Sequence, residues 1–389
     1  MVKSTEKFFE KKKEWSMIKD SVLSCYLKPY FSKIRMTKKP ILYIDGFAGT
    51  GVFQDGTNGS PLIAYSIAKE VDEYLDIQFV FIEKKYSKEL KENTKDCGNC
   101  IVIDGNYEDN IVDLIQSGVN KNVFVYIDPF GIKNMNFDYF KKMNESELYS
   151  VEFLMNLNSF GFFREGCRLL KVDCELKEDD EDMNELSGIE HMNEIAGGDY
   201  WQKIISDYKN GIINAYEAEK QFAKQYCERI MSENTFKYVI NIPIRHKNGA
   251  APKYRLVFGT NHIEGVILMN DNMSRRAETM SNIHSGGMSS LFAQNSENEI
   301  ITYEDIEQNI ISLLNDNFID YNEFLFNYIK QFGVTKTQII NSVLKKMENE
   351  KYIEIKRIPE ITKTGRKSSF ITCTHDKKCY LRKMQYEKD

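Results

Sequence analysis

Residues 41–51 read ILYIDGFAGTG, and this stretch decides the fold of the chain. Its first four residues are mostly apolar, as expected of a short strand buried in a parallel sheet, and Asp45 lies at the carboxyl end. Three glycines follow, with only small or flat residues between them: Gly46, Gly49 and Gly51. Glycine lets the backbone turn sharply and approach a ligand closely, and ligands of open α/β sheets bind just beyond the strand ends. The stretch therefore predicts a binding loop, with a plain structural turn as the alternative.

Four predicted strands alternate with helices, and each strand ends in an acidic residue. The strands span residues 41–44, 77–82, 101–103 and 123–127, and the acids are Asp45, Glu83, Asp104 and Asp128. Such alternation makes a parallel, doubly wound sheet, so the acids are expected to converge on one crevice. A single acid of this kind usually caps a helix or is solvated. Four in register favour a nucleoside-containing cofactor, with Glu83 accepting both ribose hydroxyls and Asp104 the adenine amino group.

The glycine pattern argues against a nicotinamide dinucleotide. That cofactor requires G-x-G-x-x-G opening directly into a helix, with the ribose acid about 20 residues further on. Here the next helix begins near Ser60, its expected N-cap, and Glu83 is almost twice as far away. S-adenosylmethionine (SAM), which has no phosphates, fits better. We predict that SAM binds to Asp45, Gly46, Phe47, Ala48, Gly49, Gly51, Glu83, Asp104 and Asn106.

Residues 128–131 read DPFG and follow the fourth strand. An exocyclic amine of a nucleobase is a poor nucleophile, because its lone pair is delocalised into the ring. A carboxylate and a backbone carbonyl that each accept one of its protons pull the nitrogen towards a tetrahedral geometry, and an aromatic side chain can stack on the base. We predict Asp128 and the Pro129 carbonyl as acceptors and Phe130 as the stacking surface. A plain β-turn is the alternative.

Both stretches resemble motifs of class I SAM-dependent methyltransferases. D-x-F-A-G-x-G resembles their motif I, and DPFG resembles motif IV, usually D/N-P-P-Y/F, of those that methylate exocyclic amines of nucleobases. This sequence lacks the second proline and has Gly131 in place of the aromatic residue. The DPFG form resembles that of tRNA guanine-amine dimethyltransferases, so the identity of the base stays open.

A longer run of motifs resembles the three-Cys-motif partner proteins (TcmP) of bacteria and their mobile elements. In order, the motifs are WSMIK at Trp15, YLKPYF at Tyr26, YIDGFAGTG at Tyr43, FVFIEK at Phe79, YIDPFG at Tyr126, MNLN at Met155, GGDYW at Gly197 and YRLVFGTNH at Tyr254. The resemblance covers about residues 10–285. It implies a methyltransferase-like fold and a companion, the three-Cys-motif protein, which itself resembles a radical SAM enzyme.

The remaining pattern predicts two domains joined by a linker. Residues 1–284 are predicted to form a Rossmann-like class I methyltransferase α/β domain, opened by a helix over 4–34 and carrying a helical insertion at about 160–232. Strands at 236–244 and 254–260 are expected to form an antiparallel hairpin, with Arg245, His246 and Lys247 at its turn. The acidic run 173–185 is typical of a solvated segment, and residues 285–299 are predicted to be the linker.

Residues 300–389 differ in character from the rest. Helices at 303–314, 321–330 and 335–348, then strands at 352–357 and 369–373, follow the order of a winged helix-turn-helix domain. From residue 330 to the end there are 15 Lys/Arg against 7 Asp/Glu, an asymmetry typical of a phosphate-binding surface. We predict contacts with DNA or RNA by Thr335 (the cap of the third helix), Lys336, Lys345, Lys346, Lys363, Arg366 and Lys367. Docking of a protein partner is the alternative.

Composition and motifs together narrow the function. No apolar run approaches the about 18 residues of a membrane span and no signal peptide is evident, so we expect a cytoplasmic protein with reduced thiols and no membrane partner. A zinc site joining Cys97 and Cys100 to the second group Cys373, His375 and Cys379 lacks standard ligand spacing. A nuclease is disfavoured, because no H-N-H or P-D-D/E-x-K cluster is present.

We therefore predict a SAM-dependent methyltransferase acting on an exocyclic amine of a nucleobase in DNA or RNA. The alternative is a catalytically weak or inactive methyltransferase-like partner protein, which binds nucleic acid and works with the radical-SAM-like companion.

Overall fold

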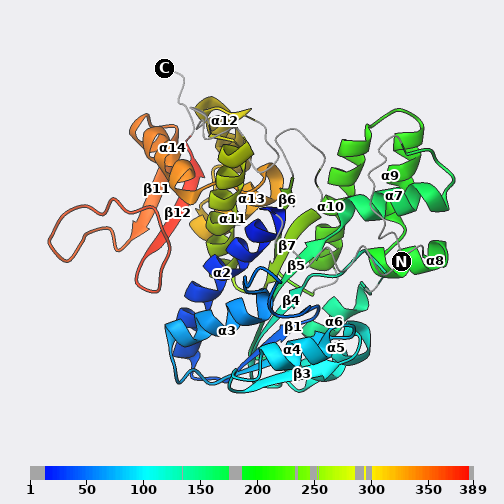
Figure 1. Cartoon of the computed structure of the whole chain (residues 1–389). Helices are drawn as coiled ribbons and strands as arrows, with labels where there is room; N and C mark the ends of the chain where they lie inside the picture. Colours follow the sequence, from blue (N-terminus) through cyan, green and yellow to red (C-terminus); the bar gives the residue numbers. More distant parts are fainter. Residues whose placement is uncertain are drawn as a thin grey trace. The chain divides into compact units, whose positions relative to one another are not determined.

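The computed structural model describes residues 14–133, 135–174, 186–232, 235–245, 252, 254–284, 293–294 and 300–384. The chain divides into two compact units, Met1–Asn261 and His262–Asp389 (Figure 1). Helix α11 (Ile263–His284) lies within residues 1–284, which we predicted to form the first domain, but it falls in the second unit, where it contacts α13 (Tyr321–Phe332) and α14 (Thr337–Asn349). Of the expected linker 285–299, only 293–294 lie within the described residues; there β8 (Ala293–Gln294) pairs with β9 (Ile300–Ile301).

The first unit is built on a seven-stranded sheet of order β3-β2-β1-β4-β5-β7-β6. Its strands are β1 (Ile41–Asp45), β2 (Ile77–Glu83), β3 (Cys100–Asp104), β4 (Asn122–Ile127), β5 (Ser150–Leu157), β6 (Tyr238–Ile244) and β7 (Tyr254–Thr260). The first five are parallel, whereas β7 runs antiparallel to both β5 and β6. The prediction of a Rossmann-like α/β sheet with a terminal antiparallel hairpin is confirmed.

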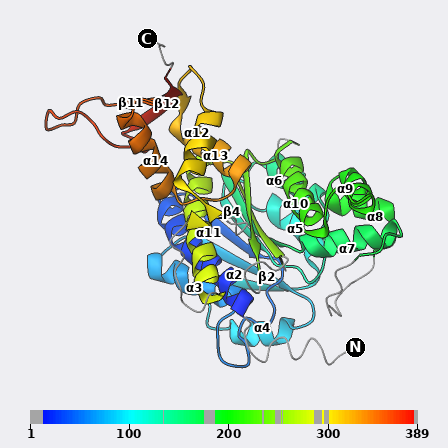
Figure 2. The same cartoon turned by 90° about the horizontal axis from the view of Figure 1, so that it is seen from above.

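Helices cover both faces of this sheet, as Figure 2 shows. One face carries α2 (Glu14–Ile34), the 3-10 turn η1 (Arg35–Thr37) and α3 (Ser60–Val71); the other carries α5 (Tyr107–Gln116) and α6 (Asp138–Glu145), with α4 (Ser87–Asn93) beside the edge strand. The α2 face is aromatic, since Tyr26 packs against Phe124 and Phe258 at centroid distances of 6.1 and 4.9 Å. The part of the predicted first helix before Glu14 lies outside the described residues.

Four helices fill the interval between β5 and β6, where the insertion is predicted. They are α7 (Ser159–Leu169), α8 (Ile189–Ala196), α9 (Tyr200–Lys209) and α10 (Ala215–Ser232). Phe162 of α7 stacks on Phe222 of α10 at 4.8 Å, and Trp201 of α9 is buried in the same core. Of the acidic run, residues 175–185 lie outside the described residues.

Besides α11, the described part of the second unit contains three helices and a small antiparallel sheet of order β10-β12-β11. The elements are α12 (Tyr303–Leu313), β10 (Ile319–Asp320), α13 (Tyr321–Phe332), α14 (Thr337–Asn349), β11 (Ile353–Ile358) and β12 (Lys378–Lys383). The predicted strand at 369–373 is wrong, because the strand paired with β11 is β12, whose Cys379 and Leu381 are buried.

Two further features concern the described residues as a whole. All eight cysteines are free thiols, and no group of three or more His, Cys, Asp or Glu side chains in the described ranges is placed to hold a metal. Among the helices that the structure describes, none combines the length and apolar character needed to cross a bilayer.

Candidate functional site

Asp45 lies beneath the glycine-rich turn and is fully shielded from solvent. Its carboxylate accepts hydrogen bonds from the Ser60 hydroxyl at 2.6 Å and from the Phe47 amide at 3.2 Å. The prediction of Ser60 as the N-cap of α3 is wrong: Gly59 holds that position, and the Ser60 hydroxyl is committed to Asp45. Asp45 therefore ties the turn to the start of α3 instead of facing outwards.

Burial and neighbouring charges together set the pKa of Asp45. Burial raises the pKa of Asp45 to about 7, and the hydrogen bonds from Ser60 and Phe47 oppose this in part. The negative charges of Asp128 and Glu83 raise the pKa of Asp45 further. β1 pairs in parallel with both β2 and β4, so the carboxyl ends of these three strands are neighbours and the charges that follow them act on Asp45.

The turn after β1 packs tightly against the body of the unit. The Gly46 amide donates to the Tyr126 carbonyl at 2.9 Å. A Cβ atom on Gly46 would lie 2.5 Å from the ring of Tyr107, and the ring of Phe47 stacks on the same tyrosine at 5.1 Å. Position 46 therefore tolerates only glycine without movement of its neighbours.

Glu83 joins the turn to the second strand. Its carboxylate accepts hydrogen bonds from the amides of Gly49 at 2.9 Å, Lys85 at 2.8 Å and Tyr86 at 3.1 Å. The Ala48 amide adds a bond to the same strand end, and the φ angles of Gly49 and Gly51 are +60° and +76°, which favour glycine. A carboxylate offers about four acceptor positions, so the three amides leave about one of them on Glu83.

Asp104 and Asn106 follow β3 at the neighbouring strand end. Asp104 is in register with Glu83 and is exposed. Asn106 is the N-cap residue of α5, and its side-chain amide donates to Asp109 at 2.8 Å. The exposed carboxylate of Asp104 is thus beside Glu83 and open to an amino group of a ligand.

The carboxylate of Asp128, directly after β4, forms an ion pair with the side-chain ammonium of Lys19. Lys19 Nζ lies 2.9 Å from one oxygen and 2.6 Å from the other, and the Asn156 side-chain amide donates to the first at 2.7 Å. The Lys19 side chain is 4% exposed and that of Asp128 is 25% exposed. Lys19 also lies 5.4 Å from the centre of the Tyr254 ring. Residues from α2, β4, β5 and β7 therefore meet at the DPFG turn.

The sequence prediction missed Lys19, Asn156 and Tyr254. Each lies in a motif that carries the TcmP resemblance: WSMIK, MNLN and YRLVFGTNH. Because a carboxylate accepts but does not donate, Asn156 must turn its NH₂ towards Asp128. The Asn156 Oδ1 atom is buried and accepts no hydrogen bond among the described residues.

The rest of the DPFG turn is partly open. Pro129 is buried, Phe130 is 44% exposed, and Gly131 has a φ of +79°. The aromatic ring of Phe130, two residues after Asp128, is thus exposed to solvent.

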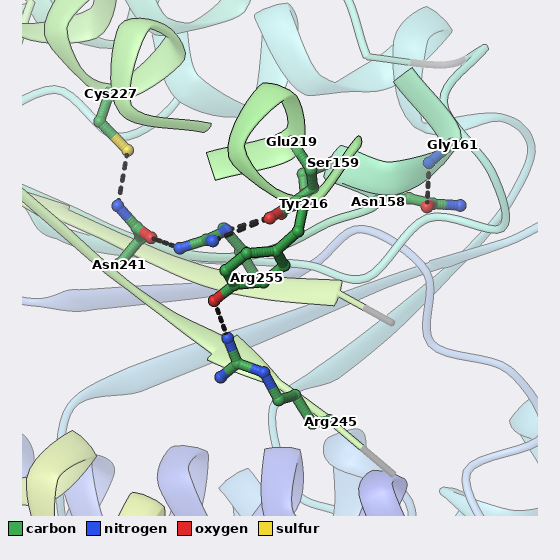
Figure 3. Close-up of polar contacts among 9 residues, drawn as sticks. All are labelled: Asn158, Ser159, Gly161, Tyr216, Glu219, Cys227, Asn241, Arg245 and Arg255. Carbon is green, nitrogen blue, oxygen red and sulfur yellow. Dashed lines mark hydrogen bonds and ion pairs between the residues drawn. The ribbon is translucent and has the colours of Figure 1, made fainter. Parts of the chain in front are cut away.

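A second polar cluster lies beside this site, over β5, β7 and β6 (Figure 3). Arg255 at the start of β7 and Glu219 of α10 are both buried and form two parallel hydrogen bonds of 2.7 and 2.8 Å. Arg255 also donates to Asn241 at 3.0 Å, and the Ser159 hydroxyl donates to Glu219. The cluster binds the inserted helices to the hairpin.

Arg245 follows β6 at the same edge of the sheet. The sequence left open whether this turn lies at the opposite edge or beside the substrate mouth and favoured a solvated turn, which is wrong for Arg245 because its side chain is buried. His246 and Lys247 lie outside the described residues. Arg245 is buried, its guanidinium donates to the Tyr216 hydroxyl, and it stacks over that ring at 5.4 Å (Figure 3). The carboxyl edge therefore carries acids over β1 to β4 and arginines over β6 and β7.

The predicted nucleic-acid contacts of the second unit separate into two groups. Thr335 is buried and is not the cap of α14, since Lys336 occupies that position. Lys336 pairs with Glu278, and Lys346 pairs with Glu307 at 2.6 Å. Four of the predicted residues are exposed and form no ion pair within the described ranges: Lys345, Lys363, Arg366 and Lys367.

Searches against family models and against curated proteins return no match for this chain. Solved structures with partial similarity include yhhF of Escherichia coli (15% identity, 33% of this chain and 64% of that chain, TM-score 0.22). The plantazolicin methyltransferase BamL, solved with SAH, aligns at 12% identity over 67% of this chain and 91% of its own, with a TM-score of 0.30. Spermidine synthase from Thermotoga maritima aligns at 9% identity over 68% of this chain and 65% of its own, with a TM-score of 0.32. The chain thus spans less than two thirds of yhhF and of this spermidine synthase, and similarity this low carries no argument about function.

Proposed function

We propose that this chain is a SAM-dependent methyltransferase that modifies an amine of a nucleobase in DNA or RNA. The observation that carries the proposal is the alignment of Asp45, Glu83 and Asp128 at the carboxyl ends of the paired parallel strands β1, β2 and β4, where Asp128 already accepts hydrogen bonds from the N–H donors of Lys19 and Asn156. A carboxylate that binds one N–H donor at this place is suited to bind another. The exposed ring of Phe130, two residues further on, suits a planar base.

The strand ends fit the donor groups of SAM. Glu83 keeps one acceptor position for a ribose hydroxyl, and Asp104 is open to an adenine amino group. The turn formed by Asp45, Gly46, Phe47, Ala48, Gly49 and Gly51 would lie against the cofactor, with Asn106 at its rim. When bound, SAM would supply an electrophilic methyl group. The protein would contribute position and hydrogen-bond acceptors.

The substrate amine would be held by Asp128 and by the Pro129 carbonyl, and Asn156 Oδ1 offers a further acceptor. Lys19 and Asn156 donate three hydrogen bonds to Asp128, so about one of its four acceptor positions is left for the incoming amine. Drawing the amine protons towards these acceptors localises the nitrogen lone pair, which is what a nucleobase amine needs in order to react.

The second unit supports a nucleic-acid substrate. Helices α12, α13 and α14 precede strands β11 and β12, which is compatible with the predicted winged helix, and exposed cations follow β11. A basic surface on an otherwise acidic chain is the electrostatic signature of phosphate binding.

The test combines binding and transfer. Calorimetry with SAM, and incubation with methyl-labelled SAM and total cellular RNA or DNA, should show cofactor binding and label in one nucleic-acid pool. Asp128→Asn should reduce labelling at least about tenfold, because it removes the acceptor, while the exposed Asp113→Asn on α5 should not. Absence of both SAM binding and label would overturn the proposal.

A second candidate function is a non-catalytic partner protein. It is favoured by Asp128 already being engaged by Lys19 and Asn156, which leaves little room for a substrate amine. Such a protein would position a three-Cys-motif radical-SAM-like enzyme on nucleic acid. Stable co-purification with that enzyme, without label in any nucleic-acid pool, would distinguish this role from the first.

A further inference from the structure

The amino end of α14 is closed by α11 of the same unit. The Thr335 amide donates to Asn270 Oδ1 at 3.0 Å, and the Asn270 side-chain amide returns a bond to the Thr335 carbonyl at 2.8 Å. The Thr337 amide donates to Asp271 at 2.8 Å. A recognition helix reads bases with its amino-terminal residues. Since α11 takes these backbone groups, this end of α14 is unsuited to enter a groove.

The cations of α14 are also largely engaged. Lys336 pairs with Glu278 of α11, and Lys346 pairs with Glu307 of α12. A cation already neutralised by a protein carboxylate gains less from a phosphate than an unpaired one. Lys345 is therefore the cation of α14 that remains for a phosphate among the described residues.

The loop between β11 and β12 contains a small turn that we call the basic hairpin, residues 361–367. Ile361 and Lys367 pair as an antiparallel bridge, the Thr362 amide donates to the Arg366 carbonyl at 2.8 Å, and the Gly365 amide returns to Thr362 at 2.9 Å. Gly365 has a φ of +77° and open space around it. Figure 1 shows the loop, drawn in orange, extending away from both strands.

Three cations project from this hairpin into solvent: Lys363, Arg366 and Lys367. They form no ion pair within the described ranges, and the same loop adds the exposed Lys377 and Lys378. Residues 358–378 contain only two acids, Glu360 and Asp376, so this part of the sequence has five cations and two acids. The excess positive charge lies on a defined turn and is available to phosphates.

We propose that the basic hairpin, and not α14, makes the main contacts with nucleic acid, and that it grips the phosphate backbone without reading sequence. This inference rests on the nucleic-acid role proposed above. Contacts to phosphate position a protein on the duplex but carry no sequence information. The second unit would therefore hold any stretch of duplex and leave the choice of base to the crevice beside Asp128.

The test measures salt-dependent binding of the full chain to two labelled DNA duplexes of unrelated sequence, by fluorescence anisotropy. The parent should bind both duplexes within about twofold of each other. The plot of log K against log salt has a negative slope, to which each phosphate contact contributes about −0.9. The triple variant Lys363→Ala/Arg366→Ala/Lys367→Ala should make this slope shallower by about 2 to 3. Unchanged thermal unfolding of this variant would show that the fold is intact.

A matched pair of single variants separates the hairpin from the helix. Lys363→Ala and Lys345→Ala each remove one exposed lysine that forms no ion pair within the described ranges. Only Lys363→Ala should make the salt dependence shallower, by about 0.9. An equal or larger effect of Lys345→Ala would overturn the inference while leaving nucleic-acid binding intact. The inference would be overturned if the parent protein bound neither duplex, or if poly-glutamate displaced the protein from DNA as well as unlabelled duplex does. Either result would point to an acidic protein partner and would leave the calorimetric test of SAM binding unaffected.

Discussion

Lys19 and Asp128 form a charge pair that is largely closed to water on the lysine side. Replacing Lys19 with methionine removes the cation from Asp128 and leaves it the hydrogen bond from the Asn156 amide. We expect Lys19→Met to lower the free energy of unfolding by about 2 kcal/mol, less than for a fully buried pair because Asp128 is partly exposed. Urea unfolding measures this change.

A second lysine of α2, in an exposed ion pair with α3, provides the control. Lys28 pairs with Glu70, and both side chains are more than half exposed, so Lys28→Met should cost less than about 0.5 kcal/mol. The double variant Lys19→Met/Asp128→Asn should cost less than the sum of its single variants. Equal costs for Lys19→Met and Lys28→Met would show that burial of the first pair has no energetic consequence.

Gly46 gives a second prediction at this scale. A Cβ atom there would lie 2.5 Å from the Tyr107 ring, so Gly46→Ala must displace the ring or the turn. We expect a loss of about 1 to 3 kcal/mol in stability and at least a tenfold loss of SAM affinity, measured by unfolding and by calorimetry. Gly98→Ala is the matched control, because its Cβ would meet no atom closer than 3.9 Å. SAM affinity unchanged in Gly46→Ala would contradict a binding role for the turn.

The positions of the strand-end acids could be predicted because chain order alone fixes which ends of parallel strands share an edge. Their environments could not. The sequence does not reveal that Asp45 is sealed beneath Ser60 or that three amides occupy Glu83. Lys19 was missed because its partner is 109 residues away in the chain, and helical periodicity says nothing about such distant contacts.

Among the elements, those with strong apolar runs were predicted well. Strands β1, β2, β4 and β7 lie where continuous apolar residues place them. The error at 369–373 has a local cause: that segment has β-forming residues, but β12 reads KCYLRK, and its charged ends hide the two buried positions. The backbone of the predicted strand serves a different purpose, since the Phe370 carbonyl accepts a hydrogen bond from Arg357.

The buried pair of Arg255 and Glu219 joins α10 to β7, so its loss should affect the attachment of the inserted helices. Arg255→Met leaves Glu219 without its cation in a fully buried position. We expect a cost of about 3 to 5 kcal/mol, because a buried charge loses its partner. The double variant Arg255→Met/Glu219→Leu should recover part of it, as judged by denaturant unfolding. A cost of Arg255→Met below about 1 kcal/mol would mean that solvent reaches the pair.

At the scale of the whole molecule, stability should depend on pH through two buried acids. Glu152 of β5 accepts hydrogen bonds from Tyr26 at 2.6 Å and from Thr260 at 2.9 Å. Burial raises the pKa of Glu152 to about 7, and it also raises the pKa of Asp45 to about 7. In the unfolded chain these carboxyl groups lose their proton near pH 4, whereas in the folded state they keep it up to about pH 7. Their contribution to the free energy of unfolding is therefore fully present below about pH 4 and is lost as the pH rises through about 7.

Glu152→Gln tests this dependence. The variant should be more stable than the parent at pH 8.5, by on the order of 2 kcal/mol, because glutamine carries no charge to bury. The gain should shrink towards pH 5, where Glu152 is protonated in the folded state. Thermal unfolding at both pH values measures it, and Glu89→Gln, on an exposed position of α4, should show no such trend. A variant no more stable than the parent at pH 8.5 would contradict the prediction.

The strand order also bears on how the protein is made. β6 precedes β7 in the chain, yet β7 is the strand that lies between β5 and β6. During synthesis the flank of β5 must therefore stay unpaired while the inserted helices and β6 leave the ribosome. An open strand edge is prone to pairing with other chains. Newly made protein is consequently most at risk of aggregation in the interval before Tyr254 emerges, and Lys19 can find its aromatic neighbour only after that point.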